Sequence, residues 1–421
     1  MCEDTAPPTG DASREPGARP RRAAVRRHMV EQPLAGTRVV ELGGGIGGGA
    51  ASKSFADFGA DVIAVEPPGG GELRRQPPFP GDRPHPDHGA FHLAFATGKR
   101  SLVLDLDTPS GREVLTRLFR TAELVLGELP PAEVPRLRAL IDPRSGPATV
   151  WLTPHGLDGP YASRREVDLS LMAWSTRMQR QGLPGREPLR RGPQAALVQA
   201  GHTAGAIGLA AWRARRREGL RQDVDVACVE AVLGNVDTAF VNWAFTGVER
   251  LYARPAPGQA PVTGTFRCGD GYVILGLTEP WGARLCRFLG TAAPGEAGYD
   301  WPETARRLHD YLASHTKRET FDELQAAGVM CAPVLDVSEI LEDPQALARG
   351  SFATVEQPGV GAVHVAGAPF RLGGVGSEED AGWRARPSPR LGEHTDEILE
   401  ELGYTTGERQ ALARAGVAAG A

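Results

Sequence analysis

The 421-residue chain has few cysteines, no long apolar run and no strong excess of either charge. Its five cysteines are odd in number and lack CxxC spacing, which argues against a disulfide scaffold or a zinc site and favours a reducing cytoplasm. The net charge of −5 gives no electrostatic reason to expect nucleic acid or an anionic membrane as a partner. No apolar run approaches the length of a membrane span. We therefore expect a cytoplasmic globular protein, long enough for two or more domains.

Acidic side chains are absent from one long stretch. The chain contains 52 Asp and Glu residues, but none between Glu187 and Glu218. This stretch is rich in glycine and alanine and includes Leu197 and Gly201. Any chemistry that needs a carboxylate here must take it from another segment or from a second chain.

Residues 1–30 are rich in Pro, Gly and Arg and lack the apolar segment of a signal peptide. The arginines at 21–27 fit either a nucleic-acid-binding tail or a disordered leader. No aromatic or basic continuation follows them, which favours the leader.

The folded part begins with a strand, a glycine loop, a helix and a second strand. Residues 37–42 are apolar and β-branched, the tract 43–49 holds six glycines, and 50–58 and 61–66 are typical of a helix and a strand. This order predicts a doubly wound α/β domain. We also expect strands at 101–106, 123–126 and 150–153, and helices at 110–121, 204–217 and 226–245, the last apolar and therefore buried.

A second, smaller region follows the Pro/Gly-rich stretch 253–264. Residues 264–277 predict a hairpin, and helices are expected at 281–289, 302–314 and 318–327. After residue 361 we expect strands and a terminal helix at 395–402. The predicted organisation is a disordered leader at 1–32, a large Rossmann-like domain from 33–250 and 351–421, a linker at 251–263 and a small α+β domain at 264–350.

The glycine tract allows more than one function. Gly43, Gly45 and Gly48 satisfy GxGxxG, and Glu66 closes the next strand where a ribose-binding acid would lie. This fits an enzyme that binds a dinucleotide or S-adenosylmethionine, since glycines let a backbone approach a phosphate at a helix N-terminus. A tract with six glycines matches many such templates by chance.

A family resemblance accounts for more of the chain. The segments that carry it are 38–66, 58–71, 98–111, 158–161, 192–212, 264–272, 328–334, 343–350, 367–372 and 391–396. Together they resemble class III CoA-transferases, the CaiB/BaiF family, over roughly 33–405 and in the order of the family. The resemblance implies a Rossmann-like large domain built from both chain ends, a smaller α+β domain and an interlocked dimer.

The resemblance also implies an acyl-CoA site. In the family, an aspartate four residues before the glycine matching Gly201 forms the acyl anhydride and thioester intermediates, and here that position is Leu197. The positions that match the CoA path are Gly45, Ile46, Gly47, Leu104, Leu129 and Arg136, and no metal is implied. Arg136 fits a phosphate contact or an exposed helix arginine equally well.

Several other positions depart from the family pattern. A lysine of the family is replaced by Ala64, and the loop that touches CoA has become 127–132. The turn at 219–222 is altered, and Val167 stands where transferases carry tyrosine and racemases carry histidine. Glu128 in the altered loop would repel a polyphosphate.

Three residues are candidates for acid/base chemistry in place of the missing aspartate. Asp168 is retained but is chiefly a structural or pocket residue in transferases. His202 follows the missing aspartate on a helix, and His155 lies on the 153–160 loop. Either histidine suits a general base near neutral pH, or is simply a surface or core residue.

Three functions remain open. The first is a repurposed CaiB/BaiF enzyme that acts on acyl-CoA or a related acyl substrate without a covalent anhydride. The second is a non-catalytic subunit, forming a heterodimer with an aspartate-bearing paralogue in place of a homodimer. The third is a transferase that uses a nucleophile from elsewhere. A nucleotide- or S-adenosylmethionine-binding enzyme is a lesser alternative.

Overall fold

The computed structural model describes residues 32–179, 181, 186–233, 238–248, 263–370, 383 and 385–418. Nearly all of the predicted leader 1–32 and linker 251–263 lie outside these residues. Within the described part of the chain, no helix is both long and apolar enough to cross a membrane.

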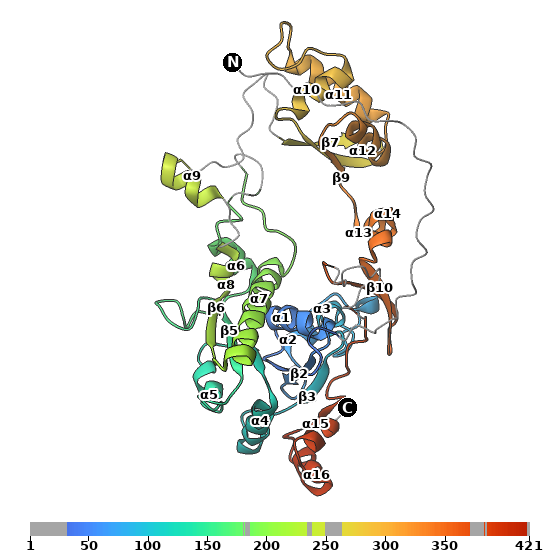
Figure 1. Ribbon diagram of the computed structural model, residues 1–421. Coiled ribbons are helices and arrows are strands. Elements are labelled where there is room, and N and C mark those ends of the chain that lie inside the picture. Colours follow the sequence, from blue (N-terminus) through green and yellow to red (C-terminus); the bar gives the residue numbers. More distant parts are fainter. Residues whose placement is uncertain are drawn as a thin grey trace, which may run out of the picture.

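A six-stranded parallel sheet forms the centre of the larger region (Figure 1). Its strands are β1 (Arg38–Leu42), β2 (Asp61–Glu66), β3 (Arg100–Val103), β4 (Leu124–Glu128), β5 (Ala148–Thr153) and β6 (Asp223–Ala227). They lie in the order β3-β2-β1-β4-β5-β6. The chain runs outward from β1 in one direction and from β4 in the other, so the strand order reverses between them. In open α/β sheets, ligands bind beside the carboxyl ends of the strands at such a reversal.

Helices cover both faces of this sheet. They are α1 (Ile46–Asp57), α2 (Glu72–Arg75), α3 (Ala90–Phe95), α4 (Pro109–Thr121), α5 (Val134–Arg138), α6 (Asp168–Trp174), α7 (Ala195–Glu218) and α8 (Cys228–Leu233), with a short 3₁₀ turn at Pro80–Asp82. Helix α9 (Thr238–Thr246) follows in the chain and lies away from the sheet (Figure 1). The C-terminal helices α15 (Thr395–Glu401) and α16 (Thr406–Arg414) return to this region.

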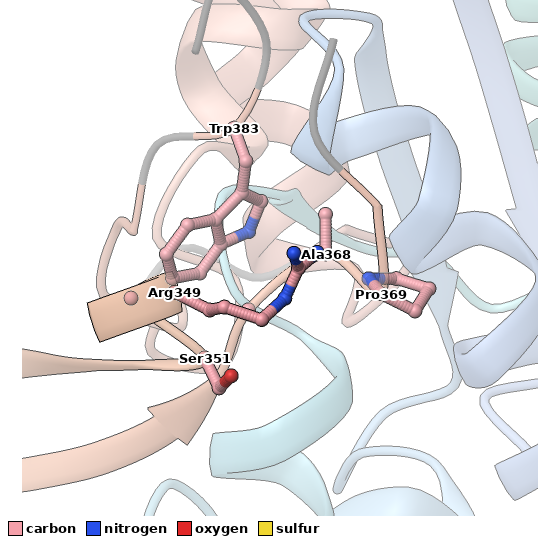
Figure 2. A pocket seen from close by; sticks show the side chains of 7 residues that line it. Arg349, Ser351, Ala368, Pro369 and Trp383 are labelled. Atoms are coloured by element: carbon pink, nitrogen blue, oxygen red, sulfur yellow. The ribbon is translucent and has the colours of Figure 1, made fainter. Parts of the chain in front are cut away.

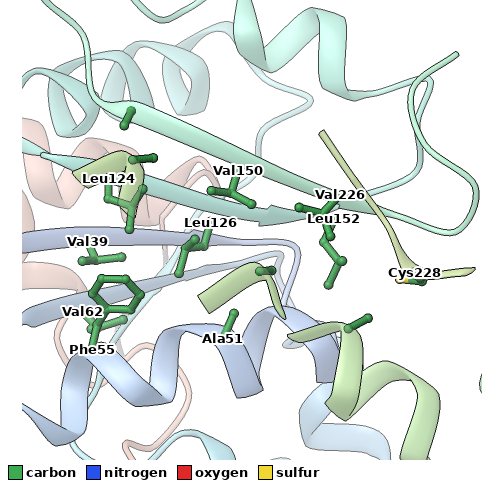
Figure 3. Packing of buried hydrophobic residues seen from close by; sticks show 14 of the residues in the cluster. Val39, Ala51, Phe55, Val62, Leu124, Leu126, Val150, Leu152, Val226 and Cys228 are labelled. Carbon is green, nitrogen blue, oxygen red and sulfur yellow. The ribbon is translucent and has the colours of Figure 1, made fainter. Parts of the chain in front are cut away.

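Successive side chains of each strand point to opposite faces of the sheet, so the core has two layers. Leu124 and Leu126 of β4 pack with α1 and α7, whereas Val125 between them packs in the layer on the other face. Figure 3 shows the first layer, in which Phe55 of α1 lies beside Val39 of β1. The second layer includes residues of α4 and of α15. The larger region is therefore built from both ends of the chain, as predicted.

A separate hydrophobic cluster lies in the smaller region. There, β7 (Thr263–Cys268), β8 (Gly271–Gly276) and β9 (Cys331–Pro333) form an antiparallel sheet with α10 (Trp281–Leu289), α11 (Trp301–Ala313) and α12 (Lys317–Ala326). The elements α13 (Val337–Glu342), α14 (Pro344–Arg349), β10 (Phe352–Gln357) and β11 (Gly361–Ala366) follow. The predicted hairpin and helices are present, and the α/β fold class is confirmed. The interlocked dimer and the domain boundaries stay predictions.

The predicted long, buried helix over 226–245 is wrong. Its first two residues end strand β6, where Val226 pairs with Leu152 of β5, and two short helices follow. On α9, Trp243 and Phe245 are exposed. An apolar run alone does not distinguish a strand from a helix, and pairing with β5 decided the first part of this one.

Candidate active site around the glycine loop

The loop between β1 and α1 consists of three glycines, Gly43, Gly44 and Gly45. Gly43 and Gly44 have φ of 97° and 59°, which favour glycine. A methyl group on Gly43 would overlap the backbone carbonyl oxygen of Glu128, and one on Gly45 would overlap the Glu128 carboxyl group. Helix α1 begins at Ile46, four residues earlier than predicted, so the last glycines of the tract lie inside the helix.

The Glu128 side chain lies against this loop. It is the last residue of β4. Its side chain lies on the same face of the sheet as those of Leu124 and Leu126, so it projects toward α1. Its Oε2 atom accepts a hydrogen bond of 2.8 Å from the Gly48 N–H near the start of α1. A methyl group on Gly47 would lie 3.4 Å from the same oxygen. The residue keeps some exposed surface.

The surroundings of Glu128 favour its protonated form. Burial of the carboxyl group raises its pKa to about 7, and the negative charges of Glu72 and Glu41 act in the same direction. The Gly48 N–H opposes this shift only partly. Within the described ranges, Glu128 forms no ion pair, whereas Glu41 is paired with Lys99 at 2.8 Å. Glu128 is therefore suited to exchange a proton near neutral pH.

The backbone of Leu197 also lies close to Gly47. Its carbonyl oxygen is 3.2 Å from the position that a methyl group on Gly47 would take. Its side chain packs on a small cluster of Ile46, Leu73 and Ala96. Helices α1 and α7 approach closely here, because a methyl group on Gly201 would overlap the Gly47 carbonyl oxygen.

Asp168 holds the start of α7. Its Oδ1 atom accepts hydrogen bonds from the Ala196 and Leu197 N–H groups, at 2.8 and 3.2 Å. The preceding Gln194 has a φ of 61° and gives no side-chain cap, so Asp168 satisfies two N–H groups that the helix leaves free. Asp168 is therefore a structural residue in this fold, and it positions the backbone at Leu197.

The two candidate histidines lie in different surroundings. The Nε2 atom of His155 is 2.9 Å from Glu166 Oε1, and this contact holds the pKa of Glu166 below its ordinary value. The His155 ring also contacts Tyr161 and Trp174. His202 is exposed on α7. The described contacts do not bring either histidine to the glycine loop.

The residues expected along the CoA path have mixed placements. Ile46 and Leu104 have no exposed surface, so neither presents its side chain to a ligand in this structure. Leu129 packs against the core layer that includes α4. Arg136 is exposed and pairs with Asp107 at 2.9 Å, which corresponds to the interpretation as an exposed helix arginine.

Glu66 has a different partner from the ribose that the GxGxxG interpretation assigns to it. Two nitrogens of Arg74 contact its two carboxylate oxygens at 2.5 and 2.8 Å, and Ser101 donates a further hydrogen bond of 2.8 Å. Burial opposes ionisation of Glu66, but the Arg74 hydrogen bonds outweigh it and hold its pKa below the ordinary value. A carboxylate that is already satisfied by a buried arginine is not available to a ribose.

A small cavity of about 130 Å³ lies elsewhere, after the end of α14 (Figure 2). It is lined by Arg349, Gly350, Ser351, Gly367, Ala368, Pro369 and Trp383. None of the predicted site residues lines it. Among the described residues, no group of three His, Cys, Asp or Glu is arranged to hold a metal ion.

Glu128 is the site residue that sequence reasoning missed. It entered only as a negative charge expected to repel CoA phosphates, but its carboxyl group lies at the glycine loop. Two signals were available: the alternation of Leu124 and Leu126 continues to Glu128, and β4 is a strand at the reversal of strand order. The second signal needed the sheet order, which the structure supplies.

Comparison with known proteins agrees with this architecture. The family model for CoA-transferase family III matches residues 34–395. The chain is 30% identical to succinyl-CoA:(R)-benzylsuccinate CoA-transferase subunit BbsE of Thauera aromatica, over 90% of this chain and 96% of that protein. It is also 30% identical to succinate–glutarate CoA-transferase of Agrobacterium fabrum, over 88% of this chain and 96% of that protein.

A solved structure has the same fold. The crystal structure of a CaiB/BaiF family protein from Brucella suis superposes with a TM-score of 0.73 at 28% identity, covering 88% of this chain and all of that one. The match to the family model, residues 34–395, spans the parallel sheet, the glycine loop and the smaller region. The chain belongs to CoA-transferase family III, an enzyme family, and is similar to its CaiB/BaiF proteins.

Proposed function

We propose that this protein binds an acyl-CoA thioester at the glycine loop and catalyses a reaction of the acyl group without an anhydride at position 197. The close approach of the glycine loop to α7, with Glu128 and Leu197 both beside Gly47, carries the proposal. The loop excludes side chains where a thioester would need to approach the backbone. The names of the CoA-transferase relatives support the substrate class.

Leu197 sets the limit on the chemistry. Its alkyl side chain has no nucleophilic atom, and it packs on Ile46 and Leu73. A covalent intermediate at this position is therefore impossible, although the fold around it is retained. We infer that the enzyme is repurposed within its family, and that catalysis depends on acid/base or electrostatic effects.

A binding titration tests this proposal. Calorimetry with CoA and succinyl-CoA should show saturable binding to the wild-type protein, and Leu197→Asp should gain CoA-transfer activity if the rest of the site is intact. Leu197→Asn is the matched control, because it adds a polar group of similar size that cannot form an anhydride. Absence of CoA and succinyl-CoA binding in all three proteins would contradict the proposal.

A second candidate is a non-catalytic subunit of an active family member. One observation favours it: the relative from Thauera aromatica is named as a subunit of its enzyme. In this case the protein would form a stable heterodimer with an aspartate-bearing paralogue. Co-expression of the two chains followed by light scattering would test it, and a homodimer that excludes the paralogue would argue against it.

A further inference from the structure

We propose that the Glu128 carboxyl group is the acid–base residue of this enzyme, and that the acyl acceptor is a hydroxyl compound, water or an alcohol. This inference rests on the proposed function, because it needs an acyl thioester at the glycine loop. It assigns the catalytic group to β4 and not to α7.

The position of Glu128 in the sheet is the first support. It ends β4, next to β1, at the reversal of strand order where α/β sheets place their ligands. Its carboxyl group and the Leu197 carbonyl oxygen lie within 3.4 and 3.2 Å of the same point, the place of a methyl group on Gly47. The carboxyl group and the backbone of Leu197, where the family segment lacks an acid, therefore lie beside the same glycine.

The second support is how the carboxyl group is held. Oε2 accepts the Gly48 N–H, and the group packs over Gly45, where a side chain would displace it. A carboxyl group fixed in this way keeps one orientation toward an adjacent substrate. Oε2 already accepts a hydrogen bond, and the loop backbone lies close to it. Proton exchange therefore fits this site better than formation of an acyl bond to Glu128.

The charges around Glu128 suit proton exchange. The titratable groups that face it are Glu41 of β1, Glu72 of α2 and Cys228 of α8. Burial raises the pKa of the Cys228 thiol, so this group is neutral near pH 7. Burial, and to a lesser extent the two glutamates, disfavour a further negative charge and raise the pKa of Glu128 to about 7, so it is near half-protonation at neutral pH.

The acceptor class follows from what such a base can do. A hydroxyl group must lose a proton when its oxygen attacks, so it gains from a base with a pKa near 7. A carboxylate acceptor has no such proton to lose and would carry the same charge as ionised Glu128. The site therefore favours a hydroxyl acceptor over a carboxylate acceptor.

The reaction step balances without another reactant. The Glu128 carboxylate takes the hydroxyl proton while the acceptor oxygen bonds to the thioester carbonyl carbon. The carbon–sulfur bond then breaks, the sulfur leaves with the electron pair, and it takes the proton from Glu128. The products are an ester, or an acid when water is the acceptor, and the free CoA thiol.

Thiol release from succinyl-CoA, with water or glycerol as acceptor, tests this role. Glu128→Gln keeps an oxygen for the Gly48 N–H and should lower kcat by about 10²–10⁴-fold while KM changes by less than about threefold. Wild-type kcat should rise as pH increases through about 7, and Glu128→Gln should lose this limb. Glu113→Gln, which removes an exposed carboxyl group of α4, should behave as wild type.

Three results would overturn the assignment. The first is turnover by Glu128→Gln within about threefold of wild type, given the expected loss. The second is an acyl group on the Glu128 peptide by mass spectrometry, which would make it a nucleophile. The third is a rate of thiol release by wild type that does not exceed the rate of Glu128→Gln.

Two further measurements separate this inference from the proposed function. Infrared titration should show a protonated carboxyl band that disappears near pH 7 in wild type and is missing in Glu128→Gln, and it needs no substrate. CoA binding by calorimetry tests the proposed function alone. Binding without Glu128-dependent turnover would refute the catalytic role and leave the proposed function standing.

Discussion

Glu66 and Glu128 occupy comparable places in the same sheet, yet their surroundings give them opposite properties. Each is the last residue of a parallel strand. Glu66 contacts Arg74 through both carboxylate oxygens, and its pKa is lowered. Glu128 has a backbone N–H as its partner and no cation among the residues that the structure describes, and burial, aided by its acidic neighbours, raises its pKa to about 7. A buried cation makes the first a structural group, whereas the second remains free to exchange a proton.

Removing the arginine should have the largest effect on stability. Arg74→Ala leaves the buried Glu66 carboxylate without its cation and also breaks the 2.7 Å ion pair with Asp87. We expect a loss of about 3–5 kcal/mol in the free energy of unfolding, measured with denaturant. Arg75→Ala is the control, because Arg75 is exposed and adjacent. A loss as small as that of the control would show that the ion pair between Glu66 and Arg74 is not needed for stability.

The pH dependence of stability should differ between wild type and Glu128→Gln. The folded-state pKa of Glu128 is about 7 against an ordinary 4.5, so the folded protein binds a proton that the unfolded chain releases. This contribution is complete below the ordinary pKa and is lost as pH rises through 7, a change of about 3 kcal/mol.

Denaturant unfolding at a series of pH values measures this difference. Wild type should lose stability relative to Glu128→Gln as pH rises, and Glu113→Gln should follow wild type. Glu66 has the opposite sign: its lowered pKa gives stability that is present above its ordinary pKa of 4.5 and is lost as pH falls. If the free energy of unfolding depends on pH in the same way in wild type and Glu128→Gln, the pKa of Glu128 is not raised in the folded protein.

A methyl group at Gly45 should change the pKa of Glu128, and its effect on stability should be smaller than that of the two preceding changes. The added carbon would overlap the Glu128 carboxyl group, which is the flexible end of a side chain and can turn toward solvent. For Gly45→Ala we expect a stability loss of about 1 kcal/mol and a Glu128 pKa that falls toward 4.5. Infrared titration measures the pKa, with Glu128→Gln identifying the band. A band that still titrates near 7 would show that packing on Gly45 is unimportant.

The exposed pair between Glu113 and Arg117 should give the smallest effect. These residues are one helical turn apart on α4, at 2.7 Å, and both side chains are exposed. Glu113→Gln should cost about 0.3–0.5 kcal/mol in the free energy of unfolding, and high salt should remove the difference. A cost similar to that of Arg74→Ala would remove the distinction between buried and exposed carboxylates.

Local sequence patterns predicted most of the fold. The β-branched runs gave the strands near 37–42 and 61–66, and the hairpin at 264–277 was found from its turn. The helix predicted at 226–245 was wrong because an apolar run has no internal signal of where a strand ends and a helix starts. The glycine tract was located correctly, but α1 begins inside it.

The site was predictable only in part. Counting from Gly201 placed Leu197 at the family's nucleophile position, and this assignment stays a prediction. The helix expected at 204–217 begins earlier, at Ala195, so Leu197 lies in its first turn. The partners of Asp168 and Arg136 depend on segments that meet only in the folded chain, so their roles could not be read from residue type. Glu128 lies far from Leu197 in sequence, and its approach to the glycine loop requires β4 beside β1.

Residue order and local pattern are enough to identify the family, the α/β class and the lack of a carboxylate at Leu197. What each remaining carboxylate does depends on the folded chain. Glu66 and Glu128 are the same residue at the ends of two strands, and only folding gives one a buried arginine and the other a glycine loop. The free energy of a charge depends on the groups around it, and those groups come from distant parts of the chain.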